Sequence, residues 1–155
     1  MNCREKTKLL FLCTGNSCRS QMAEGWARHL KGGCVEAWSA GTERHGLNPL
    51  AVKAMAEAGV DISAQRSKLA DELVDVEFDY VVTVCHGARE ACPTFPGRAR
   101  IVHVGFDDPP KLAQECDSEE DKLDCFRRVR DEIRAFVERL PHALTNPNSI
   151  QEKQT

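Results

Sequence analysis

One segment near the N-terminus, residues 8–20, reads Lys8-Leu9-Leu10-Phe11-Leu12-Cys13-Thr14-Gly15-Asn16-Ser17-Cys18-Arg19-Ser20. Its first part is a short apolar run, which is typical of a buried strand. Its middle consists of small polar residues and glycine, which favour a turn over a strand or a helix. A helical pattern begins near Ser20. The segment therefore predicts a strand, a tight loop and a helix N-terminus in immediate succession.

The predicted loop has the features of an anion site. Successive backbone N–H groups in a tight loop form a concave anion-binding surface, and the following helix adds its free N–H groups and positive dipole end. Arg19 adds a guanidinium that matches a tetrahedral oxyanion. We expect this positive field to lower the pKa of the Cys13 thiol and favour a nucleophilic thiolate. The alternative is a buried strand cysteine beside an ordinary turn.

A longer string of residues favours the first interpretation. The sequence from Cys13 to Glu24 resembles the phosphate loop of the low-molecular-weight protein tyrosine phosphatase superfamily, which includes the thioredoxin-coupled arsenate reductases. The resemblance implies that Cys13 is the nucleophile and Arg19 the oxyanion clamp, and that Asn16 and Ser20 hold the loop and the thiolate. The oxyanion-binding residues that it implies are Thr14, Gly15, Asn16, Ser17, Cys18, Arg19 and Ser20.

Length and composition predict one globular domain over residues 1–155, with an ordered core at about residues 8–140 and polar tails. The formal net charge of -3 gives no reason to expect nucleic acid or an anionic membrane as a partner. No apolar stretch approaches the length of a membrane span. The N-terminus is polar and its apolar run is too short for a signal peptide, so we expect a cytoplasmic protein.

The chain has eight cysteines, which is many for a cytoplasmic protein. Thiols in that compartment stay reduced, so catalysis or redox chemistry is favoured over a disulfide framework. No Cys-x-x-Cys pair and no zinc-finger histidine pair occurs, so no metal and no cofactor are predicted. Four cysteines are interpreted as non-catalytic: Cys3, Cys34, Cys116 and Cys125.

The rest of the chain alternates strands and helices. Further strands are predicted over residues 34–40, 78–84 and 101–104, and helices over 20–31, 49–58, 69–74 and 117–140. Such alternation is typical of a parallel α/β sheet. The resemblance implies a three-layer fold with a four-stranded parallel sheet of order 2-1-3-4 and helices on both faces. Cys13 and Cys85 would then end neighbouring strands and open into one crevice.

A second motif, Cys85-His86-Gly87-Ala88-Arg89-Glu90-Ala91-Cys92-Pro93, follows the third predicted strand. The arsenate reductases of the superfamily resemble this chain in having two cysteines there with the same spacing. The sequence Val102-His103-Val104-Gly105-Phe106-Asp107-Asp108-Pro109 resembles their acid loop, which implies that Asp108 is the general acid and Asp107 its rival. The phosphatases carry a tyrosine after Asp-Pro, whereas this chain has Pro110.

Some reductases of the superfamily hold a potassium ion beside the phosphate loop. This chain has Glu24 and Ser39 at matching positions, but Lys68 where those reductases have an acidic residue. We therefore expect the Lys68 ammonium to occupy the place of the cation.

The resemblance implies an oxidoreductase of arsenical resistance that reduces arsenate to arsenite. Cys13, Cys85 and Cys92 would act as a thiol/disulfide relay, with thioredoxin as reductant. Phosphate and sulfate would compete as oxyanions, and weak phosphatase activity is expected. Two alternatives remain open: a low-molecular-weight protein tyrosine phosphatase, and an oxyanion sensor without turnover.

Overall fold

The computed structural model describes residues 6–85 and 99–145. Four parallel strands form the sheet in the order β2-β1-β3-β4. They are β1 (Thr7–Cys13), β2 (Val35–Gly41), β3 (Tyr80–Thr83) and β4 (Arg100–His103). The predicted strands and their order are confirmed, although β3 is shorter than the apolar run that predicted it and β4 begins one residue earlier than predicted.

The register of the sheet brings the strand ends together. Cys13 pairs with Gly41 of β2, and Leu12 pairs with Thr83 of β3. All four strands run in parallel, so their carboxyl ends lie at one edge. The residues that directly follow the four strands therefore lie at the edge where ligands bind in open α/β sheets.

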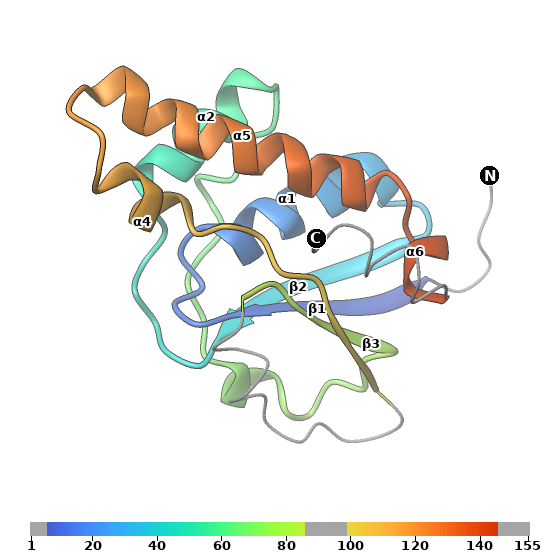
Figure 1. Cartoon of the computed structure of the whole chain (residues 1–155). Helices are drawn as coiled ribbons and strands as arrows, with labels where there is room; N and C mark the ends of the chain where they lie inside the picture. The colour runs from blue at the N-terminus through green and yellow to red at the C-terminus, as the bar shows by residue number, and fades with distance from the viewer. Residues whose placement is uncertain (1–5, 86–98, 146–155) are drawn as a thin grey trace.

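The helices are α1 (Arg19–Lys31), α2 (Pro49–Glu57), the 3₁₀ helix η1 (Ala70–Leu73), α4 (Pro109–Ala113), α5 (Glu119–Val137) and α6 (His142–Thr145). Figure 1 shows α1 and α5 together over one side of the sheet, with η1 on the other side. The helix α2 packs against α5 and lies close to α1. This arrangement is the α/β layering that the alternating pattern predicts.

Two helices begin at side-chain caps. The Asn48 side chain accepts hydrogen bonds from the backbone N–H groups of Leu50 and Ala51, and Pro49 occupies the first helical position of α2. The Ser118 hydroxyl accepts from the Asp121 N–H at the start of α5. Three acidic residues in the first turn of α5 further favour its N-terminus.

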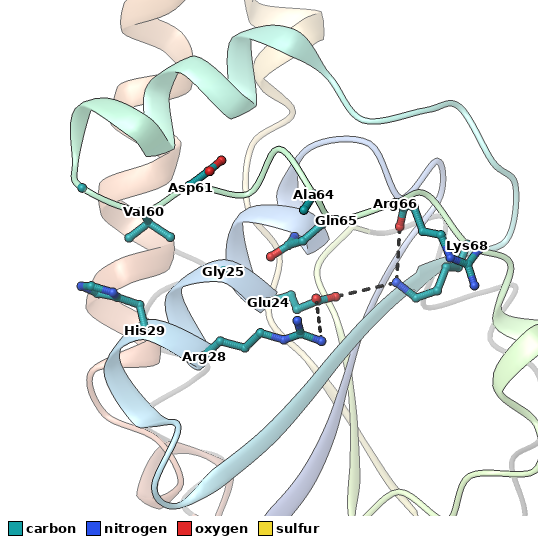
Figure 2. A pocket seen from close by; sticks show the side chains of 11 residues that line it. Glu24, Gly25, Arg28, His29, Val60, Asp61, Ala64, Gln65, Arg66 and Lys68 are labelled. Carbon is teal, nitrogen blue, oxygen red and sulfur yellow. Dashed lines mark hydrogen bonds and ion pairs between the residues drawn. The ribbon is translucent and has the colours of Figure 1, made fainter.

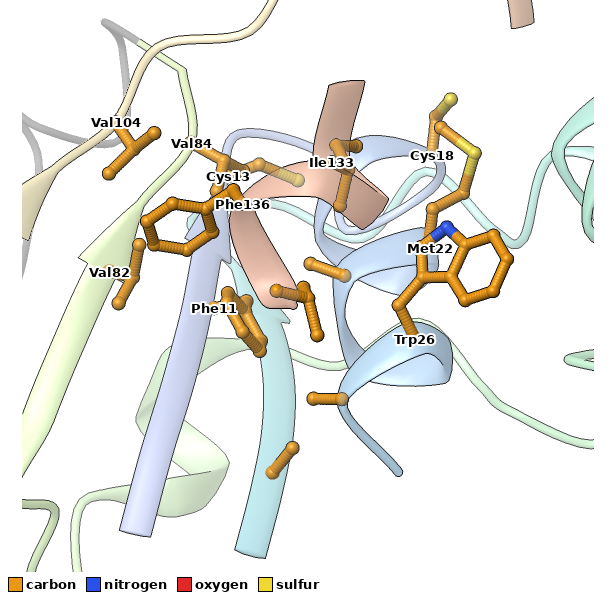
Figure 3. Close-up of a cluster of buried hydrophobic side chains, with 14 of the residues drawn as sticks. Phe11, Cys13, Cys18, Met22, Trp26, Val82, Val84, Val104, Ile133 and Phe136 are labelled. Carbon is orange, nitrogen blue, oxygen red and sulfur yellow. The ribbon is translucent and has the colours of Figure 1, made fainter. Parts of the chain in front are cut away.

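A regular apolar stripe fixes α5 on the sheet. Its buried residues recur with helical spacing, as the sequence predicts: Leu123, Phe126, Val129, Ile133, Phe136 and Val137. Figure 3 shows Ile133 and Phe136 packed among Phe11 and Val82 of the sheet and Val84, which directly follows β3, with Met22 and Trp26 of α1 alongside. Cys13 and Cys18, which flank the loop between β1 and α1, belong to the same cluster. The apolar core therefore packs directly against this loop.

Two short helices differ from the sequence-based expectation. The helix α4 begins at Pro109, the last residue of the predicted acid loop, and continues through residues for which no helix was predicted; two prolines begin it. The helix α6 follows Pro141, where the sequence predicts an end of order, because Ala143 and Leu144 are buried in the core. Within residues 6–85 and 99–145, no helix is long and apolar enough to cross a membrane.

Candidate functional site

The loop between β1 and α1 turns its carbonyl groups outward. Five consecutive carbonyl oxygens, from Cys13 to Ser17, each accept a hydrogen bond from a group outside the loop. The donors are the N–H groups of Thr42 (3.2 Å), Glu43 (2.8 Å), His45 (2.9 Å) and Asn48 (2.8 Å), and the Gln21 side chain (3.0 Å). Because the peptide planes are fixed in this way, the N–H groups face the inside of the loop, as an anion-binding nest requires.

Asn16 holds the centre of the loop. It is fully buried and has a φ of 49°, a left-handed conformation that asparagine tolerates better than most residues. Its side-chain oxygen accepts a hydrogen bond from the backbone N–H of Lys68 at 2.7 Å, and its side-chain nitrogen donates one to the Ser20 hydroxyl at 2.9 Å. The asparagine thus joins the loop to the segment before η1 and to the first turn of α1.

The strand β2 approaches the loop so closely that Gly41 permits no larger side chain. A Cβ atom on Gly41 would lie 2.6 Å from the Thr14 carbonyl oxygen and 2.8 Å from the Asn16 backbone nitrogen. A Cβ atom on Gly15, within the loop, would meet the His45 imidazole, which would have to move. The close approach of β2 therefore depends on Gly41.

Cys13 points into the nest. Its Sγ lies 2.8 Å from the Ser20 hydroxyl and accepts from the Asn16 N–H at 3.2 Å. Hydrogen bonds to a sulfur stabilise its anionic form. The family resemblance implies that Asn16 and Ser20 hold the loop and the thiol. In the structure both residues contact the Cys13 sulfur, and they are hydrogen-bonded to each other.

The expected lowering of the Cys13 pKa is wrong. Burial raises the pKa of this thiol and is the largest effect, and the nearby Cys85 raises it further. The Ser20 hydrogen bonds and the Arg19 charge lower it without reversing the direction. Burial disfavours any charged group, and the sequence did not show how deeply the core encloses this sulfur.

Arg19 and Asp108 lie together at the mouth of the loop. An Arg19 guanidinium nitrogen donates to the Phe106 carbonyl oxygen at 3.0 Å, and another lies 3.6 Å from the Asp108 carboxylate. Asp107 points elsewhere, because Arg128 of α5 binds its carboxylate at 2.7 Å. Of the two candidate acids, Asp108 is thus the one beside the oxyanion clamp.

Cys85 follows β3 and reaches the same loop. Its Sγ lies 3.3 Å from the Thr14 hydroxyl, and its side chain is buried. The sequence predicted that Cys13 and Cys85 would open into one crevice. The structure places the Cys85 thiol beside Thr14, the residue that follows Cys13. Cys92 lies outside the described residues.

A cavity of about 500 Å³ opens over the loop. Its lining includes residues from three segments of the chain: Cys13, Thr14, Gly15, Ser17, Cys18, Arg19, His45, Gly46, Leu47, Asn48, Pro49, Asp108 and Pro110. The segment 45–49 was not predicted as part of the site. The signal for it was available, because this segment follows β2, which neighbours β1, and loops at that edge share one crevice.

A second cavity of about 540 Å³ lies behind the loop, and Figure 2 shows its lining. There the buried Glu24 carboxylate accepts from Ser39 at 2.6 Å and pairs with Arg28 at 3.1 Å and with the Lys68 ammonium at 3.8 Å. Burial lowers the pKa of Lys68, and Glu24 acts in the opposite direction. Lys68 therefore brings a positive charge to Glu24, as the sequence suggested.

In the described part of the chain, no group of three or more His, Cys, Asp or Glu could hold a metal ion.

Comparisons with known proteins point to one family. The family model for low molecular weight phosphotyrosine protein phosphatase matches residues 8–153. An arsenate reductase of Bacillus licheniformis is 51% identical over 134 residues, which cover 86% of this chain and 94% of the relative. An arsenate reductase of Bacillus subtilis is 52% identical over 129 residues, covering 83% of this chain and 91% of the relative.

Solved structures give the same result. An arsenate reductase in the reduced state matches with a TM-score of 0.67 and 32% identity, covering 89% of this chain and 98% of the other. An arsenate reductase in the oxidised state matches with a TM-score of 0.71 and 30% identity, covering 86% of this chain and 95% of the other. With the loop, its cysteine and its arginine in place, the chain belongs to the low molecular weight phosphotyrosine protein phosphatase family.

Proposed function

We propose that this protein is an arsenate reductase in which Cys13, Cys85 and Cys92 pass electrons from thioredoxin to arsenate. The main supporting observation is the position of Cys85, whose thiol lies 3.3 Å from the Thr14 hydroxyl beside the nucleophile loop. Hydrolysis of a phosphate ester has no use for a second thiol there. Relatives that are about half identical to this chain are named arsenate reductases.

In the first step, the Cys13 sulfur attacks arsenic in bound arsenate, an S–As bond forms and one As–O bond breaks. The Cys13 proton passes through Asp108 to the departing hydroxyl oxygen, which leaves as water. Arg19 and the inward N–H groups hold the remaining oxygens.

In the second step, Cys85 attacks the Cys13 sulfur. The S–As bond breaks, its electron pair reduces arsenic from the pentavalent to the trivalent state, and a Cys13–Cys85 disulfide remains. Cys92 then attacks Cys85, which frees Cys13 as a thiol. Thioredoxin reduces the Cys85–Cys92 disulfide. Such a relay needs a reducing compartment, so we propose that the protein acts in the cytoplasm.

A phosphatase is the second candidate, and the loop supports it by itself, because the nest, Cys13, Arg19 and Asp108 are the groups that ester hydrolysis needs. Pro110 follows Pro109 where the superfamily's phosphatases carry a tyrosine, which favours the reductase. The third candidate, an oxyanion sensor without turnover, would bind arsenate and consume no electrons.

The deciding experiment follows NADPH oxidation in the presence of thioredoxin and thioredoxin reductase, with arsenate added last. We expect arsenate-dependent turnover in the native protein and none with Cys85→Ser or Cys92→Ser. Both variants should still hydrolyse an aryl phosphate at about the native rate, because hydrolysis needs no second thiol. Cys125→Ser is the matched control for loss of a thiol away from the loop.

Undiminished arsenate turnover in both Cys85→Ser and Cys92→Ser would contradict the relay. Aryl phosphate hydrolysis with no arsenate-dependent NADPH oxidation in the native protein would instead favour the phosphatase. Arsenate binding with neither activity would favour the sensor.

A further inference from the structure

A second pair of thiols lies outside the site described above. Cys116 follows α4 and Cys125 belongs to α5, and their sulfurs are 3.7 Å apart. Both side chains are partly exposed and both are free thiols. A disulfide needs sulfurs about 2.05 Å apart, so the two thiols are in contact without being bonded.

The backbone holds each sulfur in place. The Cys116 thiol lies 3.7 Å from the Leu112 carbonyl oxygen, and the Cys125 thiol lies 3.5 Å from the Asp121 carbonyl oxygen. The two thiols also contact each other. The pair is therefore arranged before any ligand arrives, which lowers the entropy cost of binding one atom with both sulfurs.

The surroundings of Cys116 disfavour its thiolate form. The contact with Cys125 is the largest cause that raises the pKa of Cys116, followed by burial and by the negative charges of Asp121 and Asp117. A protonated thiol attacks disulfides poorly, since the thiolate is the nucleophile. This environment argues against a second redox relay at Cys116 and Cys125.

The same surroundings argue against a divalent cation. Zinc binds deprotonated thiolates and takes four ligands in structural sites. Among the described residues, no group of three or more His, Cys, Asp or Glu could hold a metal ion, so only the two sulfurs are placed to bind here. The fitting ligand is an electrophile that takes two neutral thiols and is satisfied by two sulfurs.

We propose that Cys116 and Cys125 form a dithiol binding site for trivalent arsenic, separate from the reduction site. Arsenous acid carries three hydroxyl groups on one arsenic atom. Two As–O bonds break, two S–As bonds form, and the two hydroxyls leave with the thiol protons as two waters. Arsenic stays trivalent, so the step needs no oxidant or reductant.

The sulfur positions fit a one-atom bridge. An atom that holds two thiolate sulfurs at bond lengths of about 2.3 Å, as zinc does, separates them by about 3 to 4 Å. The observed separation of 3.7 Å already lies in this range, so binding needs little movement. The supply of trivalent arsenic rests on the proposed function, because arsenate reduction would produce it. The binding of trivalent arsenic by the two thiols does not depend on that function.

The helix α4 connects the two sites. Its N-cap is Asp108, and Pro110 in its first turn lines the cavity over the phosphate loop. Cys116 lies shortly after its last residue, Ala113. Arsenic released over the loop would therefore meet the dithiol at the other end of the same short segment.

The test measures uptake of sodium arsenite by the full chain in which Cys13, Cys85 and Cys92 are all replaced by serine. Intact-mass measurement under non-denaturing conditions should find one arsenic per chain, with the loss of two waters. Adding Cys116→Ser or Cys125→Ser should weaken uptake at least tenfold, whereas adding Cys18→Ala should leave it unchanged. Arsenite should also protect Cys116 and Cys125 from alkylation by iodoacetamide.

A second probe separates the dithiol from a single thiol. Phenylarsine oxide takes two thiols with loss of one water, and a small dimercaptan should remove it while a monothiol at the same concentration should not. Circular dichroism and aryl phosphate hydrolysis by the single variants Cys116→Ser and Cys125→Ser, with the relay cysteines intact, would show that these variants fold.

Equal arsenite uptake after loss of Cys116 or Cys125 would overturn the proposal. So would a mass two hydrogens lower with no arsenic, which indicates a disulfide. Because arsenite is added directly, these results do not depend on the proposed function. If the proposed function were wrong, the native protein would show no arsenate-dependent NADPH oxidation.

Discussion

Cys13 and Cys116 are both thiols with a raised pKa, but the physical reasons differ. For Cys13 the first cause is burial in the core, and Ser20 and Arg19 oppose it. For Cys116 the first cause is its contact with Cys125, and the acidic residues Asp121 and Asp117 add to it. One thiol is enclosed among groups that stabilise its anion, whereas the other lies near the surface beside negative charges.

This difference assigns the two cysteine regions to different chemistry. An oxyanion brought to Cys13 meets the inward N–H groups and Arg19, which favour negative charge developing on the substrate. An oxyanion brought to Cys116 would meet Asp117 and Asp121 instead. We therefore expect attack on arsenate at Cys13 and uptake of a neutral trivalent compound at Cys116.

The largest expected effect separates the two regions directly. Cys13→Ser should lower both arsenate reduction and aryl phosphate hydrolysis by a factor of about 10³ or more, because a serine hydroxyl is a far weaker nucleophile than the Cys13 thiolate. Cys125→Ser should leave both rates within about twofold. Steady-state assays of both activities check this, and substantial turnover by Cys13→Ser would remove that residue from its role.

The next effect concerns the two aspartates. Asp108→Asn should slow arsenate reduction about 10²- to 10³-fold, the usual weight of a general acid. Asp107→Asn is the matched control and should change the rate by less than about threefold, since it breaks only an exposed ion pair with Arg128. Equal losses in both variants would contradict the assignment of the acid.

A smaller effect tests how the Ser20 hydrogen bond acts on the Cys13 pKa. Ser20 lowers this pKa, so Ser20→Ala should raise it, and the thiolate fraction at a fixed pH near 7 should fall. Alkylation of Cys13 by iodoacetamide should then slow about fivefold, the equivalent of a hydrogen bond worth about 1 kcal/mol. The rate should rise with pH in both proteins, with the variant's curve displaced to higher pH. A curve displaced to lower pH would show that Ser20 destabilises the thiolate.

The smallest effect concerns Lys68. Because its ammonium already lies 3.8 Å from the Glu24 carboxylate, replacing sodium by potassium at equal ionic strength should change the reduction rate by less than about twofold. Lys68→Asp removes this charge and should make the rate respond to potassium, whereas the exposed Lys53→Asp should not. A native protein that potassium activates several-fold would show that Lys68 does not replace a cation.

Much of the fold was predictable from local patterns. The apolar run before Cys13, the Asn48-Pro49 start of α2 and the stripe of α5 each carry their own structural signal, because strand period, capping and helix period act over a few neighbouring residues. The helix α6 was missed, since burial of Ala143 and Leu144 against the core leaves no such local signal.

The sequence by itself determined the loop, its cysteine and arginine, and the expectation that Cys13 and Cys85 share one edge. Only the tertiary structure decided that Asp108, and not Asp107, faces Arg19, because an arginine of the distant α5 binds Asp107. It also reversed the expected pKa shift of Cys13 and brought Cys116 against Cys125. Each of these depends on burial or on partners far along the chain, and electrostatic balance follows from those surroundings rather than from neighbours in sequence.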